Sequence, residues 1–196
     1  MNITVAGGNV ANNIYAGGQG EFSTVDGNAS VTFTGVNNYT CNVYGYITPT
    51  IANNSPDTVL NFADFTGTIS GDIGGFTEIA FSGDTAATLS GAAIDNDDWI
   101  FDYTDRTLDA GLAMLTFDDG ALSGEVAVDL SDVAQVATGW NIAAGLDSAV
   151  AAYGVELATG SANGLRLNDT LDSSYGIYEG WGFTLEDSTL KFKQLA

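Results

Sequence analysis

Apolar and polar residues alternate along several short segments of this chain. The clearest of these segments are residues 3–5, 31–34, 79–81, 125–130 and 189–193. Because a period of two places successive side chains on opposite faces of a strand, each segment is predicted to be a half-buried β-strand. Gly-Gly, Asp-Gly and Asn-Asn pairs lie between them and are typical of tight turns. The pattern therefore favours a mainly β fold.

The first half of the chain also repeats its own pattern. The two best copies begin at Ile3 and Val31, and looser copies begin at Leu60 and Ile79. Repeats with a period of about 20–50 residues indicate stacked units that bury their apolar stripes against one another. Since each unit holds strands rather than helices, residues 1–94 are predicted to form a right-handed parallel β-solenoid.

The character of the sequence changes after about residue 94. Residues 95–196 contain more Leu, Trp and Asp, and the repetition fades. This region is predicted to be β-rich, with hairpins near residues 113–122 and 182–192 and one short helix over residues 131–138. A solenoid needs a terminal cap that stops further stacking. We therefore expect residues 95–196 to continue the solenoid and close it.

The charge of the chain restricts both its partners and its sources of stability. It has 25 Asp and Glu against 4 Lys and Arg, which gives a formal net charge of −21. This charge repels phosphates and argues against nucleic-acid binding. The first basic residue is Arg106, so the preceding part cannot form side-chain ion pairs with its own residues. Cohesion there is expected to come from apolar burial and backbone hydrogen bonds.

The ends and apolar segments of the chain bear on its location. No segment approaches the roughly 18 uninterrupted apolar residues of a membrane span, so direct membrane insertion of this segment is not expected. Residues 1–5 lack the basic and apolar regions of a signal peptide. If the chain is exported, we expect it to be a piece of a longer protein.

Several catalytic chemistries are missing from this sequence. It contains no histidine, which excludes Ser-His-Asp and Cys-His catalysis and His-ligated zinc. Cys41 is the single cysteine, so no intrachain disulfide forms, and it is interpreted as a small buried residue rather than a reactive thiol. Acidic pairs among residues 95–105 leave polysaccharide cleavage as an alternative. Enzymes that cleave acidic polysaccharides need cations to hold the substrate carboxylates, and the first half of the chain has none. No catalytic residue is therefore assigned.

An acidic segment is the candidate metal site. Asp95, Asp97 and Asp98 offer the hard oxygen ligands that calcium prefers. The alternating pattern of a calcium-binding loop breaks at Trp99, and the glycine-rich repeat of calcium-binding β-rolls is absent. Calcium is therefore the one cofactor considered, with aspartates that serve only turns and solvation as the alternative.

An aromatic segment is the candidate ligand site. Tyr175, Tyr178 and Trp181 form the densest aromatic cluster, and small residues separate them. Aromatic rings stack on sugars, which makes a carbohydrate-binding module an alternative function. Packing of these rings in a core or cap is the other interpretation, because aromatic side chains commonly dominate cores.

The turn glycines and alternating strands resemble a known kind of protein. Residues 3–8, 13–18, 81–84, 87–91 and 181–190 are similar to repeats in the β-helical passenger regions of bacterial autotransporter-like adhesins. The resemblance implies an extracellular solenoid on the bacterial cell surface that serves adhesion or spacing and carries no catalytic residues. The expected partner is a glycan or protein of a host or bacterial surface. A second copy of the chain is also expected to associate, because an unpaired strand edge near residues 1–20 can pair with another chain. A polysaccharide-cleaving β-helix enzyme is the third alternative.

Overall fold

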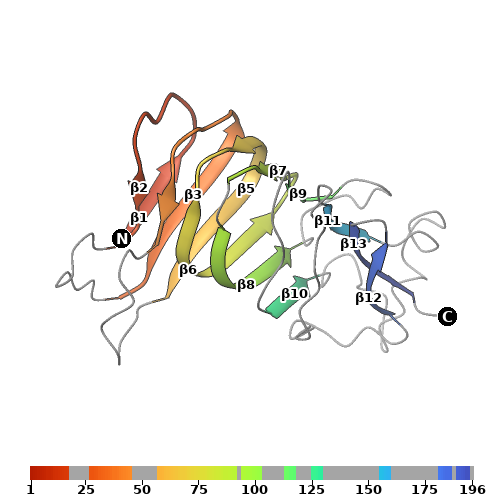
Figure 1. Cartoon of the computed structure of the whole chain (residues 1–196). Coiled ribbons are helices and arrows are strands. Elements are labelled where there is room, and N and C mark those ends of the chain that lie inside the picture. Colours follow the sequence, from red (N-terminus) through yellow and green to blue (C-terminus); the bar gives the residue numbers. More distant parts are fainter. Residues whose placement is uncertain are drawn as a thin grey trace.

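The strands of this protein form one mostly parallel sheet. The computed structural model describes residues 1–17, 27–45, 57–91, 94–102, 113–117, 125–129, 155–159, 181–186 and 189–194. Within these ranges every regular element is a β-strand, and thirteen strands belong to a single sheet. Figure 1 shows the strands following one another from the N-terminal end to the C-terminal hairpin. The prediction of a mainly β fold is confirmed.

The strands differ widely in length, from two residues to twelve. Their bounds are β1 (Asn2–Val5), β2 (Ile14–Tyr15), β3 (Ala29–Val36), β4 (Val43–Tyr44), β5 (Thr58–Ile69), β6 (Ile73–Ser82), β7 (Ala86–Leu89), β8 (Ile94–Asp102), β9 (Leu115–Phe117), β10 (Glu125–Asp129), β11 (Val155–Thr159), β12 (Trp181–Glu186) and β13 (Thr189–Gln194). All five segments that the alternating pattern selects lie wholly or mainly in strands.

A first ladder of parallel strands runs through the molecule. It consists of β1, β3, the first half of β5, the second half of β6, β8 and β10. One row of paired residues contains Ile3, Val31, Leu60, Ile79, Trp99 and Val126. We call the chain between two neighbouring strands of this ladder a pass. Residues one pass apart in the sequence are therefore neighbours in space.

Two further ladders are formed by the chain between the strands of the first. The second ladder joins the end of β5 to β7, β9 and β11 in parallel, and continues antiparallel through β13 and β12. The third is shorter and places Ile14, Val43, Ile73 and Ile94 side by side. Strand β5 belongs to both the first and second ladders because it bends near Asp64, a non-glycine residue with a φ of 50°. The Asp64 carboxylate accepts a hydrogen bond from the Asp84 N–H over 3.0 Å.

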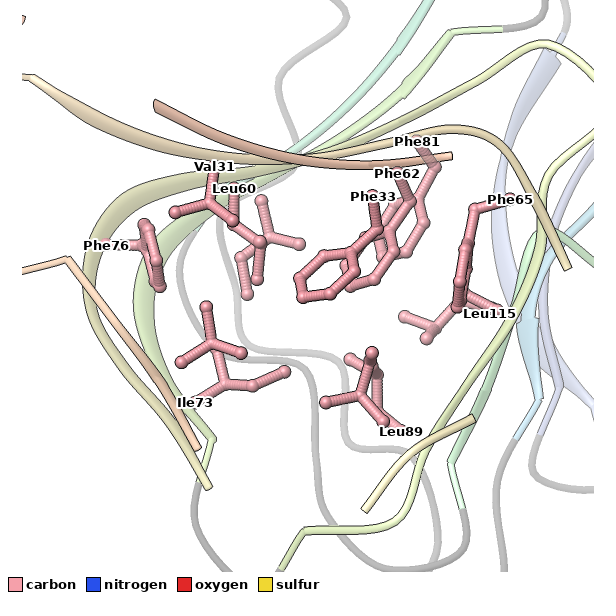
Figure 2. Close-up of a cluster of buried hydrophobic side chains, with 14 of the residues drawn as sticks. Val31, Phe33, Leu60, Phe62, Phe65, Ile73, Phe76, Phe81, Leu89 and Leu115 are labelled. Carbon is pink, nitrogen blue, oxygen red and sulfur yellow. The ribbon is translucent and has the colours of Figure 1, made fainter. Parts of the chain in front are cut away.

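The core lies between the ladders and is built from stacked side chains. The rings of Phe33 and Phe62 have centroids 5.7 Å apart, and those of Phe62 and Phe81 are 5.2 Å apart, both in stacked geometry. Figure 2 shows these three rings in line, with Leu89 across from them and Ile73 across from Val31 and Leu60. Stacked aromatic pairs add about 0.5–1.5 kcal/mol to the free energy gained by burial. The Phe33 and Phe62 rings also contact Phe65, so the aromatic column joins the first ladder to the second.

Polar side chains at the corners bind the backbone of the following pass. The Asn38 side-chain oxygen accepts a hydrogen bond from the Thr68 N–H, and that of Asn42 accepts one from the Asp72 N–H, each over 2.8 Å. Glycine is also required at two of these corners, because a side chain there would leave no room for the backbone of the preceding pass. A Cβ atom on Gly71 or Gly91 would collide with the backbone carbonyl of the preceding pass. These corners allow neighbouring passes to approach closely.

Several predictions concern single elements of the fold. Strands β12 and β13 pair antiparallel, which confirms the hairpin expected near residues 182–192. Cys41 is buried, as predicted, and burial raises the pKa of its thiol. The helix expected over residues 131–138 lies outside the described residues. Strand β8 begins at Ile94 and pairs with β6 and β10, so pairing continues past residue 94, where the domain boundary is predicted.

The part of the chain that the structure describes contains no helix long and apolar enough to cross a membrane. An ion pair lies near the C-terminal end, where the Lys191 Nζ is 3.5 Å from a Glu186 carboxylate oxygen. The N-terminal passes are instead joined by apolar contacts and backbone pairing, as the distribution of basic residues requires.

Candidate functional site

Acidic residues occupy paired positions on neighbouring strands of the first ladder. The register places Glu78 beside Asp98 and Asp98 beside Glu125, and it places Asp102 beside Asp129. Burial raises the pKa of the Glu78 carboxyl, and the nearby charges of Asp98 and Asp57 raise it further. Like charges on directly opposed strand positions are destabilising. We call Glu78, Asp98 and Glu125 the acidic row.

The predicted metal ligands are only partly described. Asp98 belongs to the acidic row, whereas the side chains of Asp95 and Asp97 lie outside the described part of the structure. Among the described residues, no group of three or more His, Cys, Asp or Glu side chains is arranged to hold a metal ion. Calcium at residues 95–98 stays a prediction.

The predicted aromatic ligand site lies almost wholly outside the described residues. Tyr175 and Tyr178 are not described, and Trp181 is placed only by its backbone, at the start of β12. The structure does contain a stacked pair on the third ladder, Tyr15 and Tyr44, with ring centroids 5.6 Å apart. Sequence reasoning did not select this pair as a site. Its signal in the sequence is that similar Ile-Tyr and Val-Tyr dipeptides occur in the first two copies of the repeat.

A row of threonines crosses the outer face of the second ladder. The paired positions on β5, β7, β9, β11 and β13 are all threonine, namely Thr68, Thr88, Thr116, Thr159 and Thr189. All five are half-buried, which is expected of outward side chains flanked by neighbouring strands. The hydroxyl oxygens of Thr159 and Thr189 are 3.0 Å apart and hydrogen-bonded. We call these five residues the threonine row.

The strand segments that carry the first three residues of the threonine row are uncharged, whereas β11 and β13 carry Glu156 and Lys191, which pair in register. Strand segments 66–69, 86–89 and 115–117 contain no ionisable residue. Asn38 lies at one end, where its side chain accepts the hydrogen bond from the Thr68 backbone. Glu186 lies at the other end opposite Thr189, and its carboxylate is paired with Lys191. The row is therefore a neutral strip of hydroxyl groups on an otherwise acidic molecule.

Sequence reasoning missed the threonine row because its members are irregularly spaced along the chain. No constant period connects them, since the connections between their strands differ in length. The alternation of polar and apolar residues places each threonine on the outer face of its strand, since the next residue inward is buried at Ile69, Leu89 and Phe117. It does not reveal which threonine lies beside which.

Comparison with known proteins adds no family to this picture. No protein-family model matches the chain, and no curated protein or solved structure matches it. The function is therefore inferred from the residues of the chain itself.

Proposed function

We propose that this chain is a non-catalytic structural or adhesive segment of a bacterial surface protein, located outside the cell. In this proposal residues 1–94 form a right-handed parallel β-solenoid, and residues 95–196 cap it. The observation that carries the proposal is the row of Ile3, Val31, Leu60, Ile79 and Trp99, which aligns five successive strands of the first ladder. Crossovers between parallel strands are almost always right-handed.

The C-terminal strands support the capping part of this proposal. Parallel pairing continues along the second ladder as far as β11, and the next strand, β13, pairs antiparallel. Strand β12 then pairs antiparallel with β13, so the hairpin replaces a further pass. A change from parallel stacking to a hairpin ends the repetition, which is what a terminal unit of a solenoid must do.

The physical basis of stability also suits an exposed surface protein. The N-terminal passes are joined by buried apolar side chains and backbone hydrogen bonds, with no disulfide available. Apolar burial depends little on salt, in contrast to surface ion pairs, which salt screens. The excess of acidic residues keeps such a protein dispersed. Adhesion would then use the outer faces of the ladders.

Deleting one complete pass tests the solenoid. Removal of residues 30–58 joins Ala29 to Val59, which takes the place of Ser30 and restores the same ladder register. In a solenoid the shortened chain folds, because each unit contacts only its neighbours. Removal of residues 30–43 is the matched control, since it brings third-ladder residues into the first ladder. We expect cooperative thermal melting for the first deletion only; equal behaviour of the two would contradict the solenoid.

Adhesion is tested with the full chain on beads. We expect beads coated with the chain to be retained on bacterial or epithelial cells more than beads coated with an equally acidic, unrelated protein. Retention should persist in high salt, because a chain of charge −21 does not bind acidic cell surfaces by electrostatic attraction. Equal retention of both kinds of bead would refute the adhesive role.

A further inference from the structure

We propose that the threonine row binds an uncharged, hydroxyl-rich polysaccharide that lies along the row, across the strands of the second ladder. This inference rests on the proposed adhesive function and names its surface and the chemistry of its partner. The observation behind it is the register that brings Thr68, Thr88, Thr116, Thr159 and Thr189 into one line.

The geometry of the row suits an extended polymer. Neighbouring strands of a sheet lie about 4.8 Å apart, so five paired positions span about 19 Å. Each threonine contributes a hydroxyl that both donates and accepts hydrogen bonds, and a methyl group that contacts apolar surface. A chain of sugar rings presents the same two features, hydroxyl groups and C–H faces, at regular intervals. The row therefore offers repeated, equivalent contacts instead of a pocket.

The row is also ordered before a partner binds. Threonine is branched at Cβ, which restricts its side chain to few rotamers in a strand. The Thr159 and Thr189 hydroxyls already hold each other, and the Thr68 backbone is fixed by Asn38. Binding to such a surface costs less conformational entropy than binding to long, mobile side chains.

Charge selects the class of polysaccharide. The overall charge of −21 repels uronate and sulfated chains. A polymer placed on the acidic row of the first ladder would have to displace water from ionised carboxylates, which is costly. The threonine row carries no carboxylate along its length from Thr68 to Thr189. A neutral polymer that lies along these five positions therefore meets hydroxyl groups, with the Glu186–Lys191 ion pair at the Thr189 end.

The test measures binding of the full chain to neutral polysaccharides. The probes are insoluble cellulose, β-1,3-glucan and chitin in co-sedimentation, with polygalacturonate as an anionic comparison. We expect at least one neutral polymer to bind and polygalacturonate not to bind. The double variant Thr88→Val/Thr116→Val removes two central hydroxyls and keeps the branched shape. Since each lost hydrogen bond weakens binding several-fold, we expect affinity for that polymer to fall about tenfold.

A matched control separates the row from a general effect of losing hydroxyls. Thr4 and Thr32 are paired on the outer face of the first ladder, so Thr4→Val/Thr32→Val makes the same chemical change elsewhere. We expect this control to bind as the unaltered chain does, with thermal melting of both double variants confirming that they fold. Loss of binding in the control alone would overturn the inference.

Other outcomes distinguish the inference from the proposed function. If Trp181→Ala abolishes polysaccharide binding and the threonine variant does not, the aromatic site is correct and the threonine row is not. If the chain adheres to cells but binds none of the neutral polymers, the inference fails and the adhesive role stands. Incorporation of the chain into growing ice without polysaccharide binding would also overturn it, because the row would then order water alone.

Discussion

The first and second ladders both align like residues in register, and they differ in the chemistry of those residues. On the first ladder Glu78, Asp98 and Glu125 meet in register, and the pKa of Glu78 is raised by burial and by its acidic neighbours. On the second ladder five threonines meet in register, and two of them share a hydrogen bond. In-register pairing thus brings like side chains together: carboxylates repel one another, whereas the Thr159 and Thr189 hydroxyls form a hydrogen bond.

The largest loss of stability is expected from a change in the core that lies beneath both ladders. Phe62 is fully buried and stacks on Phe33 and Phe81 beneath the first ladder, and it also contacts Phe65 toward the second. We expect Phe62→Ala to lower the free energy of unfolding by about 3–5 kcal/mol, because it leaves a cavity in the core.

Chemical denaturation measures this loss, and Phe62→Leu is the control. Leucine keeps most of the buried apolar volume, so we expect a clearly smaller effect. A change below about 1 kcal/mol in Phe62→Ala would be incompatible with a common core beneath the two ladders.

A smaller loss of stability is expected at Gly91, which lies in the corner that follows β7. A Cβ atom at Gly91 would meet the Gly71 carbonyl, and the backbone must shift to make room. We expect Gly91→Ala to reduce the free energy of unfolding by about 1–3 kcal/mol. Ser90→Ala, one residue earlier, should cost much less. Equal thermal melting of the two variants would show that the passes do not approach as closely as described.

Two carboxylates on the second ladder reproduce the charge repulsion of the first. The variant Thr88→Asp/Thr116→Asp places two carboxylates side by side on the second ladder. We expect it to lose about 1 kcal/mol, since like charges opposed across strands repel and Asp is a poor strand former. The repulsive part should shrink in high salt.

The uncharged control for this conversion is Thr88→Asn/Thr116→Asn, whose stability should not depend on salt. If the Asp and Asn variants respond identically to salt in thermal melting, the two threonines are not neighbours, and the register of the second ladder is wrong.

The smallest effect concerns the acidic row and depends on pH. Because the folded state raises the Glu78 pKa above its ordinary value of 4.5, folding favours the protonated carboxyl. The stability contributed by Glu78 is therefore greatest below pH 4.5 and falls as pH rises through the raised pKa. We expect Glu78→Gln to stabilise the protein slightly at neutral pH, and this gain to shrink below pH 4.5.

Thermal melting across this pH range provides the measurement. Asp57→Asn should give part of the same gain, because the Asp57 charge contributes to the Glu78 shift after burial and Asp98. A gain in Glu78→Gln that does not vary with pH would show that ionisation of this residue is not its cause.

The strands were largely predictable from the sequence, whereas the acidic row and the threonine row were not. Alternation located β1, β3 and β10, because a half-buried strand must place every second side chain in the core. Asp98 was selected as an acidic residue, but its neighbours Glu78 and Glu125 belong to other strands, distant from it in the sequence. No local pattern connects them.

Two local features of the sequence specify which side of each strand faces the core and that the N-terminal passes hold together without ion pairs. These features are the period of two and the absence of basic residues before Arg106. Which outward residues become neighbours depends on the folded register. The in-register residues from Ile3 to Val126 are unevenly spaced along the chain, because the passes differ in length. The alternation of residues decides which side chains of a strand face the core. The pairing register of the strands decides which residues are neighbours, and connections of unequal length hide that register in the sequence.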